Sequence, residues 1–379
     1  MKLVFLSHEY HCMGGAQKCL LDLLKGLKQN HPEWEIYMIF PGRGDFVDAC
    51  SCYLSGYKIF RMKWWLVGEK ERITIRMRLS YIRKLLKTGL KLAWYINRIK
   101  PDYAVTNTLA IPYLAFTCKL LNVKHYWFIH EVPTVTWANL GFIFKPEIIF
   151  KLVDRLSSKI LVTSKYVKQY YQYSMPPSKL FVITQAVKLE PVSGVDLHRD
   201  SHKRYTLLMV GAFDSNKGQL DLLHAIKVIL DEGRDIFCYL VGPDFGFSAP
   251  CEDYIKKNML TDNVKIVPFV KQIYPYYYKA DALLVCSTFE TFSRVAVEAQ
   301  MCGLPVILSN VGANPERIKD GVDGLLYQKG DIIDLVKKIE ILRDVSTRKG
   351  FSANINPAMV MKKYSLDNFA SDFSVLLNT

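Results

Sequence analysis

The sequence has no long uncharged apolar run, and this excludes a membrane-spanning helix. A bilayer span needs about 18 or more such residues, and no apolar run in the 379 residues is that long. The run before His8 is too short for a signal peptide, so we expect it to form a first strand. Hydrophobic residues make up 50% of the chain and charged residues 23%, which indicates an ordered globular protein, and the length predicts two domains.

Metal-binding and redox motifs are missing as well. The nine cysteines include no C-x-x-C, and the nearest pair, Cys50 and Cys52, is too tight for zinc. The eight histidines do not cluster with cysteines or carboxylates. We therefore expect a cytoplasmic protein with reduced thiols, no metal ion and no other cofactor. The fingerprint G-x-G-x-x-G is also absent, which argues against a nicotinamide enzyme.

Short runs rich in β-branched and aromatic residues alternate with helical patterns along the whole chain. The expected strands are residues 2–7, 35–40, 102–107, 125–130, 159–164 and 180–185 in the first half, and 205–211, 237–242, 264–269, 282–287 and 305–309 in the second. Alternation of this kind predicts parallel, doubly wound sheets. The predicted fold class is therefore α/β, with two Rossmann-like doubly wound domains facing a central cleft.

A polar segment without periodicity, residues 188–204, predicts a linker between these domains. It separates an amino-terminal domain, residues 1–187, from a carboxyl-terminal domain, residues 205–360. Helical patterns follow the last expected strand, at residues 331–342, 357–363 and 366–377.

Two glutamates stand eight residues apart where an expected strand is followed by a helix. Glu290 lies in the turn after the apolar run 282–286, and Glu298 lies about one turn into the helical run 294–301. In open α/β sheets, ligands bind at the carboxyl ends of the strands. Carboxylates accept hydrogen bonds from hydroxyls, and the N–H groups of a helix start bind anions, so the pattern suits a nucleotide sugar. The alternative is that both glutamates are ordinary solvated carboxylates.

The segment 287–326 resembles the donor-site segment of the family-4 retaining glycosyltransferases of GT-B fold. The positions that match the family pattern are Glu290, Phe292, Glu298, Ala299, Gly303, Pro305, Val306 and Ile307. Two positions depart from it, because Ser293 stands where the family usually has glycine and Arg294 where an apolar residue is common. The resemblance also implies that the final helix, residues 361–379, packs back on the first domain.

The run 209–226 resembles the phosphate-binding loop of the same family. Lys217 and Gly218 match its Lys-Gly dipeptide, and Gly211 ends the strand before it. A lysine here would neutralise the diphosphate as charge builds on the leaving group. The family usually has an arginine at the position of Ala212. Arg294 is a candidate for supplying that missing charge, or it is a solvated residue at the helix start.

Three further loops match the family more weakly. Gly14 and Gly15 look like its first glycine loop, whose backbone can approach a phosphate, although a glycine pair is more often a plain turn. The loops at Gly242 and Val270 would surround the nucleotide base, or would only connect elements.

His130 ends an expected strand, and a histidine at the matching place contacts the transferred sugar in the family. Glu131, the next residue, would orient His130 or bind the acceptor.

The resemblance implies an enzyme that moves a sugar from a nucleoside diphosphate to an acceptor hydroxyl and keeps the anomeric configuration. Glu298 would hold the ribose hydroxyls and Glu290 the sugar hydroxyls. Lys217 and the glycine loops would hold the diphosphate, with Phe292, Ser293 and Arg294 beside it. His130 would hydrogen-bond the sugar near the reacting carbon. No D-x-D motif occurs between the expected strands of the first domain. We therefore expect positive charge and helix dipoles, and no metal ion, at the diphosphate.

Positive charge is concentrated in residues 58–100. Thirteen Lys and Arg stand there against two Glu, a net charge of +11 in a chain of +14, with Trp64, Trp65 and Trp94 among them. A basic helix with aromatic anchors predicts a surface for anionic lipid headgroups. The alternative is an amphipathic helix packed on its own sheet. No motif supports nucleic acid.

We therefore expect peripheral attachment at the cytoplasmic membrane face and a lipid-linked glycan acceptor, as in bacterial surface polysaccharide assembly. Two other functions remain open. A non-catalytic nucleotide-sugar-binding or scaffold protein is favoured by Ala212 and Ser293. A sugar-nucleotide epimerase of the same fold uses acids and histidines in different loops and fits the segment less well. The base, the sugar and the acceptor do not follow from the sequence.

Overall fold

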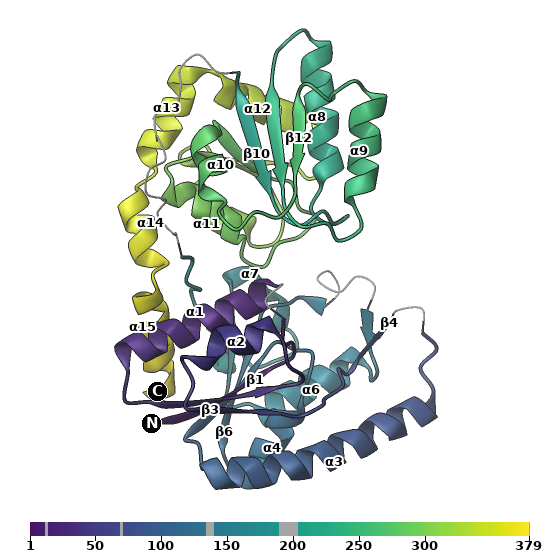
Figure 1. The fold of residues 1–379 in the computed structure, drawn as a ribbon, viewed down its shortest axis with the longest axis vertical. Coiled ribbons are helices and arrows are strands. Elements are labelled where there is room, and N and C mark those ends of the chain that lie inside the picture. Colours follow the sequence, from purple (N-terminus) through teal and green to yellow (C-terminus); the bar gives the residue numbers. More distant parts are fainter. Residues whose placement is uncertain (12–13, 69–70, 134–139, 189–203, 379) are drawn as a thin grey trace. The chain divides into compact units, whose positions relative to one another are not determined.

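The computed structural model describes residues 1–11, 14–68, 71–133, 140–188 and 204–378 (Figure 1). The chain forms two units, one made of Met1–Ala186 with Tyr364–Thr379 and the other of Val187–Lys363. The linker expected at 188–204 lies almost wholly outside the described residues. Among those residues, no helix combines the length and the apolarity that a bilayer crossing requires.

The first unit is built on a seven-stranded parallel sheet. Its strands, in spatial order, are β3 (Gly56–Ile59), β2 (Glu35–Phe40), β1 (Lys2–Ser7), β5 (Tyr103–Asn107), β6 (Lys124–Ile129), β8 (Lys159–Val162) and β9 (Leu180–Val182). Side chains of a strand alternate between the two faces. Leu3 and Phe5 of β1 therefore join one apolar cluster, and Val4 and Leu6 join the other.

Helices cover both faces of this sheet. The helices of the first unit are α1 (Gly15–Asn30), α2 (Asp45–Ser51), α3 (Ile75–Ile99), α4 (Tyr113–Leu121), α6 (Pro146–Leu156), α7 (Lys165–Tyr171), the short η1 (Pro177–Lys179) and α15 (Leu366–Asn378). Helices α1, α2 and α15 pack on the face of Leu3 and Phe5, whereas α3 and α4 pack on the opposite face. A small antiparallel pair, β4 (Leu66–Gly68) with β7 (Leu140–Phe142), lies beside the sheet.

The second unit repeats the plan with six parallel strands. They are, in spatial order, β12 (Val264–Val267), β11 (Phe237–Val241), β10 (Thr206–Val210), β13 (Ala282–Val285), β14 (Val306–Ser309) and β15 (Gly324–Tyr327). Its helices are α8 (Gln219–Asp231), α9 (Ser248–Lys257), α10 (Tyr274–Lys279), α11 (Arg294–Met301), η2 (Asn314–Glu316), α12 (Ile332–Arg343), α13 (Val345–Asn354) and α14 (Pro357–Lys363). One apolar cluster joins the sheet to α8, α9 and α12, and the other joins it to α10 and α11.

The expected fold class is confirmed, because both units are parallel sheets with helices on both faces. Four strands were not predicted from the sequence, namely β3, β4, β7 and β15. They have three or four residues each, and three of them include a glycine near the turn where they begin or end. The apolar signal in such short strands is too brief to stand out from a loop.

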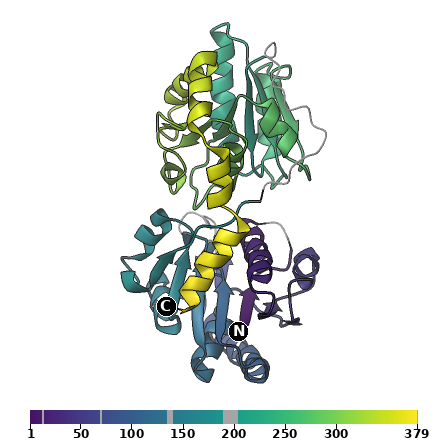
Figure 2. The ribbon, with the colours of Figure 1, turned by 90° about the vertical axis from the view of Figure 1, so that its left-hand side faces the viewer.

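The carboxyl-terminal helix α15 lies beside α1 in the first unit (Figure 2). Gly26 of α1 faces the start of α15, and a Cβ at that position would lie 2.5 Å from the carbonyl oxygen of Leu366. Asn30 Nδ2 donates to Asp367 Oδ1 at 2.8 Å, and the rings of Phe5 and Phe373 are 6.0 Å apart. Glycine is therefore needed in mid-helix because two backbones meet there.

Replacing Gly26 by alanine should lower the stability of the first unit by about 1–3 kcal/mol, because the added methyl group strikes a backbone atom. Gly89→Ala in α3 is the matched control, since a Cβ there meets nothing within 4 Å, and it should add roughly 0.5–1 kcal/mol by helix propensity. All six tryptophans lie between residues 34 and 137, so urea unfolding followed by tryptophan fluorescence reports on this unit. Equal effects of the two substitutions would contradict the contact.

Candidate functional site

The order of strands in the second unit creates a topological switch point between β10 and β13. The chain runs outward from β10 through β11 to β12, and then returns to the other side of β10 as β13. Loops that leave neighbouring strands at such a point diverge and leave a crevice for ligands at the carboxyl edge. The two loops here are residues 211–218 and 286–293, which carry five of the twelve site residues expected from the sequence, namely Gly211, Lys217, Glu290, Phe292 and Ser293.

An ion pair joins these two loops. Lys217 Nζ lies 2.7 Å from Glu290 Oε1, and the Ser287 hydroxyl donates to the same oxygen at 2.8 Å. The attraction of Glu290 raises the pKa of Lys217 against the opposing effect of burial. The Glu290 side chain is 14% exposed and that of Lys217 35% exposed, so the ammonium group is within reach of solvent. An ammonium group has three donors, which leaves two for a ligand anion.

Two glycines allow the loops to come this close. Gly218 has φ +76°, and a Cβ there would lie 2.1 Å from the carbonyl oxygen of Cys286 at the end of β13. Gly312 has φ +54°, and a Cβ there would lie 2.1 Å from the carbonyl oxygen of Glu290. The amide of Thr288 also donates to the Asn216 carbonyl at 2.7 Å. The backbone contacts therefore fix the position from which Lys217 and Glu290 meet.

Helix α11 begins four residues after Glu290 and carries the second glutamate. Its first turn follows Ser293, which has φ +60°, so this position adopts the left-handed conformation that favours glycine. This explains why glycine is usual there in the resembling family. The Ser293 hydroxyl is buried and makes no hydrogen bond within the described residues. Glu298, about one turn along, accepts a hydrogen bond from Tyr277 Oη at 2.7 Å.

The other predicted residues of this unit lie around the same edge. Gly211 and Gly242 extend β10 and β11, and a Cβ on Gly242 would lie 1.9 Å from the Gly211 carbonyl oxygen. Arg294 is the first residue of α11 and is half-buried. Phe292 is buried, and the Arg317 guanidinium lies 4.6 Å from its ring centre, so it packs as part of the loop's support.

Val270 follows β12 and is half-buried against the apolar cluster under α10. Its side chain therefore contributes to the core as well as to the rim of the edge. Its assignment to the nucleotide base stays a prediction.

The first unit has its own switch point, between β1 and β5. Gly14 and Gly15 precede and begin α1 there, and a Cβ on Gly15 would meet nothing within 4 Å. Asn107, at the end of β5, donates from Nδ2 to the carbonyl oxygen of Ala16 at 3.3 Å. Its Oδ1 lies 2.8 Å from Nε2 of His130, at the end of β6. Asn107 thus links the predicted histidine to the start of the helix after the glycine pair.

The protonation of His130 follows from these contacts. Burial, and then the charge of His8, lower the pKa of His130 to about 3, so the ring is neutral at pH 7. An amide oxygen can only accept, so Nε2 carries the hydrogen and donates to Asn107. Nδ1 is then the acceptor nitrogen, and it is able to accept a hydrogen bond from a hydroxyl.

Glu131 is turned toward the backbone. Its Oε2 accepts the amides of His130 at 3.0 Å and Leu109 at 3.3 Å. Burial raises the pKa of this carboxyl to about 7, even though those hydrogen bonds favour its ionised form. Glu131 therefore fixes the loop that carries His130, and its expected roles, orienting the histidine or binding the acceptor, stay predictions.

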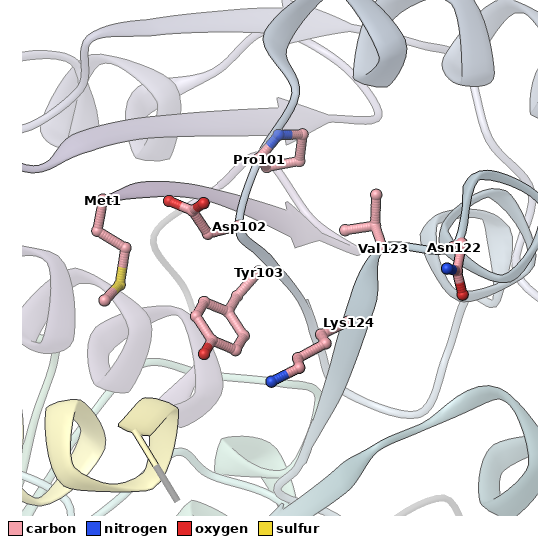
Figure 3. A pocket seen from close by; sticks show the side chains of 7 residues that line it. All are labelled: Met1, Pro101, Asp102, Tyr103, Asn122, Val123 and Lys124. Carbon is pink, nitrogen blue, oxygen red and sulfur yellow. The ribbon is translucent and has the colours of Figure 1, made fainter.

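A separate hollow of about 540 Å³ lies at the opposite edge of the first sheet (Figure 3). It is lined by residues around the amino ends of β1, β5 and β6, among them Asp102, Tyr103 and Lys124. Lys124 Nζ lies 5.4 Å from the Tyr103 ring centre, and Asp102 accepts the amide of Lys2 at 2.7 Å. Asp102 and Lys124 thus have partners within the chain. Ligands of doubly wound sheets bind at the carboxyl edge, which is the other edge of the sheet. We do not include this hollow in the candidate site.

The structure therefore brings Lys217 and Glu290 into contact and places Glu298 on the adjoining helix, where Tyr277 holds it. His130 and the Gly14–Gly15 loop belong to the first unit. Three supporting residues were not predicted from the sequence: Ser287, Tyr277 and Asn107. Ser287 and Asn107 carry a recognisable signal, because each is a polar residue at the carboxyl end of an apolar strand run. Within the described residues, no cluster of three or more His, Cys, Asp or Glu side chains is placed to hold a metal ion.

Two Rossmann-like units with this strand order are the architecture of the GT-B glycosyltransferases. The solved structure of Anabaena HepE in complex with UDP matches 100% of both chains with a TM-score of 0.77 at 18% identity. The apo form of the lipopolysaccharide outer core galactosyltransferase WaaB matches 100% of this chain and 99% of its own, with a TM-score of 0.73 at 18% identity. At this identity the likeness establishes the fold.

Sequence comparison points to the same class. Residues 198–355 match the family described as "Glycosyl transferases group 1". An uncharacterized glycosyltransferase of Methanocaldococcus jannaschii is 30% identical over 237 residues, which cover 62% of this chain and 63% of that protein. The lipopolysaccharide 1,6-galactosyltransferase of Escherichia coli is 23% identical over 89% of this chain and 87% of its own.

A protein from the cps region of Klebsiella pneumoniae is 29% identical over 60% of this chain and 63% of its own length. The chain therefore spans just under two thirds of this relative and of the archaeal one.

Gly218→Ala should destabilise the second unit more than Gly233→Ala does. Both glycines have nearly the same positive φ, +76° and +77°, but only at Gly218 would a Cβ strike another backbone. The left-handed conformation alone costs alanine about 1–2 kcal/mol, and the clash should add about 1–3 kcal/mol. Urea unfolding followed by circular dichroism measures both. The contact between the two loops would be refuted by equal losses.

Acid should destabilise the first unit partly through His130. Its pKa is about 3 in the folded state and 6.5 in the unfolded chain, so the unfolded state binds the proton first as the pH falls. Stability is therefore lost below pH 6.5, by about 2 kcal/mol between pH 7 and pH 5. His130→Gln should reduce the loss between these two pH values by about that amount, measured by tryptophan fluorescence in urea. His11→Gln, at an exposed position of the same unit, is the control for removing an imidazole, and the loss should remain.

Proposed function

We propose that this protein is a retaining glycosyltransferase that moves a sugar from a nucleoside diphosphate to an acceptor hydroxyl. The observation that carries the proposal is the Lys217–Glu290 pair at the switch point of the second unit. A cation that is 35% exposed and is held beside a carboxylate at the carboxyl edge of the sheet suits a donor with both phosphates and hydroxyls. Residues 198–355, which match the group 1 glycosyltransferases, contain this pair.

Each residue of the site has a role in this proposal. The Lys217 ammonium offers its remaining donors to the diphosphate, helped by the N–H groups at the start of α11. Glu290 Oε1 already takes the bonds of Lys217 and Ser287, which leaves Oε2 to accept from sugar hydroxyls. Glu298 accepts from ribose hydroxyls while Tyr277 holds it in place. The neutral His130 accepts from a hydroxyl of the transferred sugar through Nδ1.

The chemical step exchanges one bond at the anomeric carbon for another on the same face. The bond to the leaving phosphate oxygen breaks as the bond to the acceptor oxygen forms. The acceptor's proton passes to the leaving diphosphate, so no carboxylate of the protein is needed as a nucleophile. Positive charge from Lys217, and from Arg294 at the start of α11, stabilises the diphosphate as it departs. Arg294 thereby replaces the arginine that the family has at the position of Ala212.

Descriptions of similar proteins support the classes of donor and acceptor. Structures of Anabaena HepE are described with UDP and with UDP-glucose, which supports a nucleotide-sugar donor. The relatives include a lipopolysaccharide galactosyltransferase and a capsular polysaccharide biosynthesis glycosyltransferase of Staphylococcus aureus. We infer that the acceptor is a lipid-linked glycan of a surface polysaccharide and that the protein works at the cytoplasmic membrane face. No metal ion is part of the proposal.

The proposal is tested first by binding of UDP, GDP and ADP to the whole chain, measured by calorimetry and thermal shift. For the nucleotide that binds, Lys217→Met should weaken binding about 10–100-fold, the equivalent of one charge-assisted hydrogen bond. Lys217→Met with Glu290→Gln shows how much of that loss comes from leaving the carboxylate without its partner. Lys227→Met is the control, because Lys227 pairs with Asp231 on α8. Arg294→Ala should weaken binding as well, and unchanged binding would exclude its role.

Turnover decides between the enzyme and its rival. We expect the purified protein to hydrolyse, or to transfer the sugar from, the nucleotide sugar that carries the nucleotide found to bind. Glu290→Gln should slow this reaction by at least about tenfold. A nucleotide-sugar-binding scaffold, which Ala212 and the strained Ser293 favour, would bind the donor and show neither reaction. If none of the three nucleotides binds, transfer from a UDP-, GDP- or ADP-linked sugar is excluded, and so is a scaffold that binds such a donor.

A further inference from the structure

We infer that the outer face of α3 docks on a bilayer containing anionic lipid, and that an apolar groove beside α3 takes the hydrocarbon chain of one lipid. The basic segment of the sequence already suggested a membrane surface. The structure adds a groove and an exposed apolar stripe next to the charge. This inference does not depend on glycosyl transfer, because it is tested without any donor.

Helix α3 has two apolar sides. One side packs on the sheet through Leu92, Ile96 and Ile99. The second side is open to solvent and recurs every three or four residues along 25 residues of helix. Its members are Ile75, Leu79, Ile82, Leu86, Leu90 and Trp94, of which Leu86, Leu90 and Trp94 are 62%, 67% and 66% exposed. A helix that only packed on its own sheet would not need this stripe.

An apolar groove of about 450 Å³ lies along this stripe, between α3, α4 and α6. Helix α3 contributes Leu85, Leu86 and Gly89 to the groove. Figure 1 shows α3 extended along the outer side of the first unit with α4 beside it. Leu120 of α4 and Ile148 of α6 stand at the groove and are 69% and 47% exposed. The groove is within the size range of small-molecule sites, and its lining suits a hydrocarbon chain.

The charge of α3 identifies the occupant. The helix contains seven Lys and Arg and no acidic residue. Arg83, Lys84, Lys87 and Lys91 are exposed on the side that adjoins the apolar stripe, and none of them pairs with a carboxylate in the described part of the chain. Basic residues next to an exposed apolar stripe are the pattern of a helix that lies in the interface of an anionic membrane. A second copy of the chain would instead bring like charges together.

The test is flotation of the whole protein with vesicles of phosphatidylcholine, alone or mixed equally with phosphatidylglycerol. Binding should require phosphatidylglycerol and weaken with salt. Leu86→Asp with Leu90→Asp should lower the partition coefficient at least about tenfold, and Lys84→Glu with Lys87→Glu should do the same. These positions are exposed, so the fold should survive. Met359→Asp, at a position 69% exposed in α14, is the control and should bind as the unchanged protein does.

The groove is tested separately with Gly89→Leu, which fills it and alters no charge. In a Trp94→Phe background, lipids brominated on the chain should quench Trp65, which lines the groove. Gly89→Leu should remove that quenching and leave flotation unchanged; persistent quenching would exclude a chain in the groove. The docking surface would be overturned if the protein bound neutral vesicles as well as anionic ones. It would also be overturned if the α3 variants bound anionic vesicles as well as the unchanged protein does. A third outcome would overturn it as well: the protein binds no vesicles and forms a dimer, and Leu86→Asp with Leu90→Asp converts that dimer to a monomer. A second copy of the chain would then cover the stripe.

Discussion

The candidate site of the second unit depends on the close approach of two backbones at the ends of β10 and β13. An ammonium and a carboxylate on separate loops can be held 2.7 Å apart only if the loops themselves are fixed. The glycine at 218 allows one loop to lie against the carbonyl of Cys286, and the glycine at 312 lets a third loop lie against the carbonyl of Glu290. The ionic contact is therefore the result of the packing and not its cause. This order of dependence suits a site where a ligand must compete for the charges without unfolding the loops.

The same constraint accounts for the one residue that departs most clearly from its resembling family. A left-handed position at the start of α11 is imposed by the loop, whichever residue occupies it. Serine takes this position at a cost in backbone energy, and its hydroxyl is buried among the described residues without a hydrogen bond. Strain that persists at the start of a helix beside charged groups is common at ligand sites, because the surrounding structure maintains it.

Most of the architecture was predictable from local pattern. Eleven expected strands and the helices between them are present, because alternating apolar runs report directly on burial. The short strands β3, β4, β7 and β15 were not predictable, since three or four residues give too brief an apolar signal to stand out from a loop. At the site, Glu290 was found through its place after a strand and Lys217 through the resemblance to the family's phosphate-binding loop, and the structure pairs them. Tyr277 could not be found in this way, because only the packing of α10 brings its hydroxyl to Glu298.

The position of α15 has a consequence for the order in which the protein can assemble. This helix is translated after the whole second unit, yet it packs on α1 of the first unit. The first unit must therefore wait, with the apolar side of α1 uncovered, until the second unit has been translated. The second unit is contiguous in sequence and is able to fold while the chain is still being made. A chain cut short before residue 366 would leave a complete second unit attached to an unfinished first one, a natural substrate for chaperones and proteases.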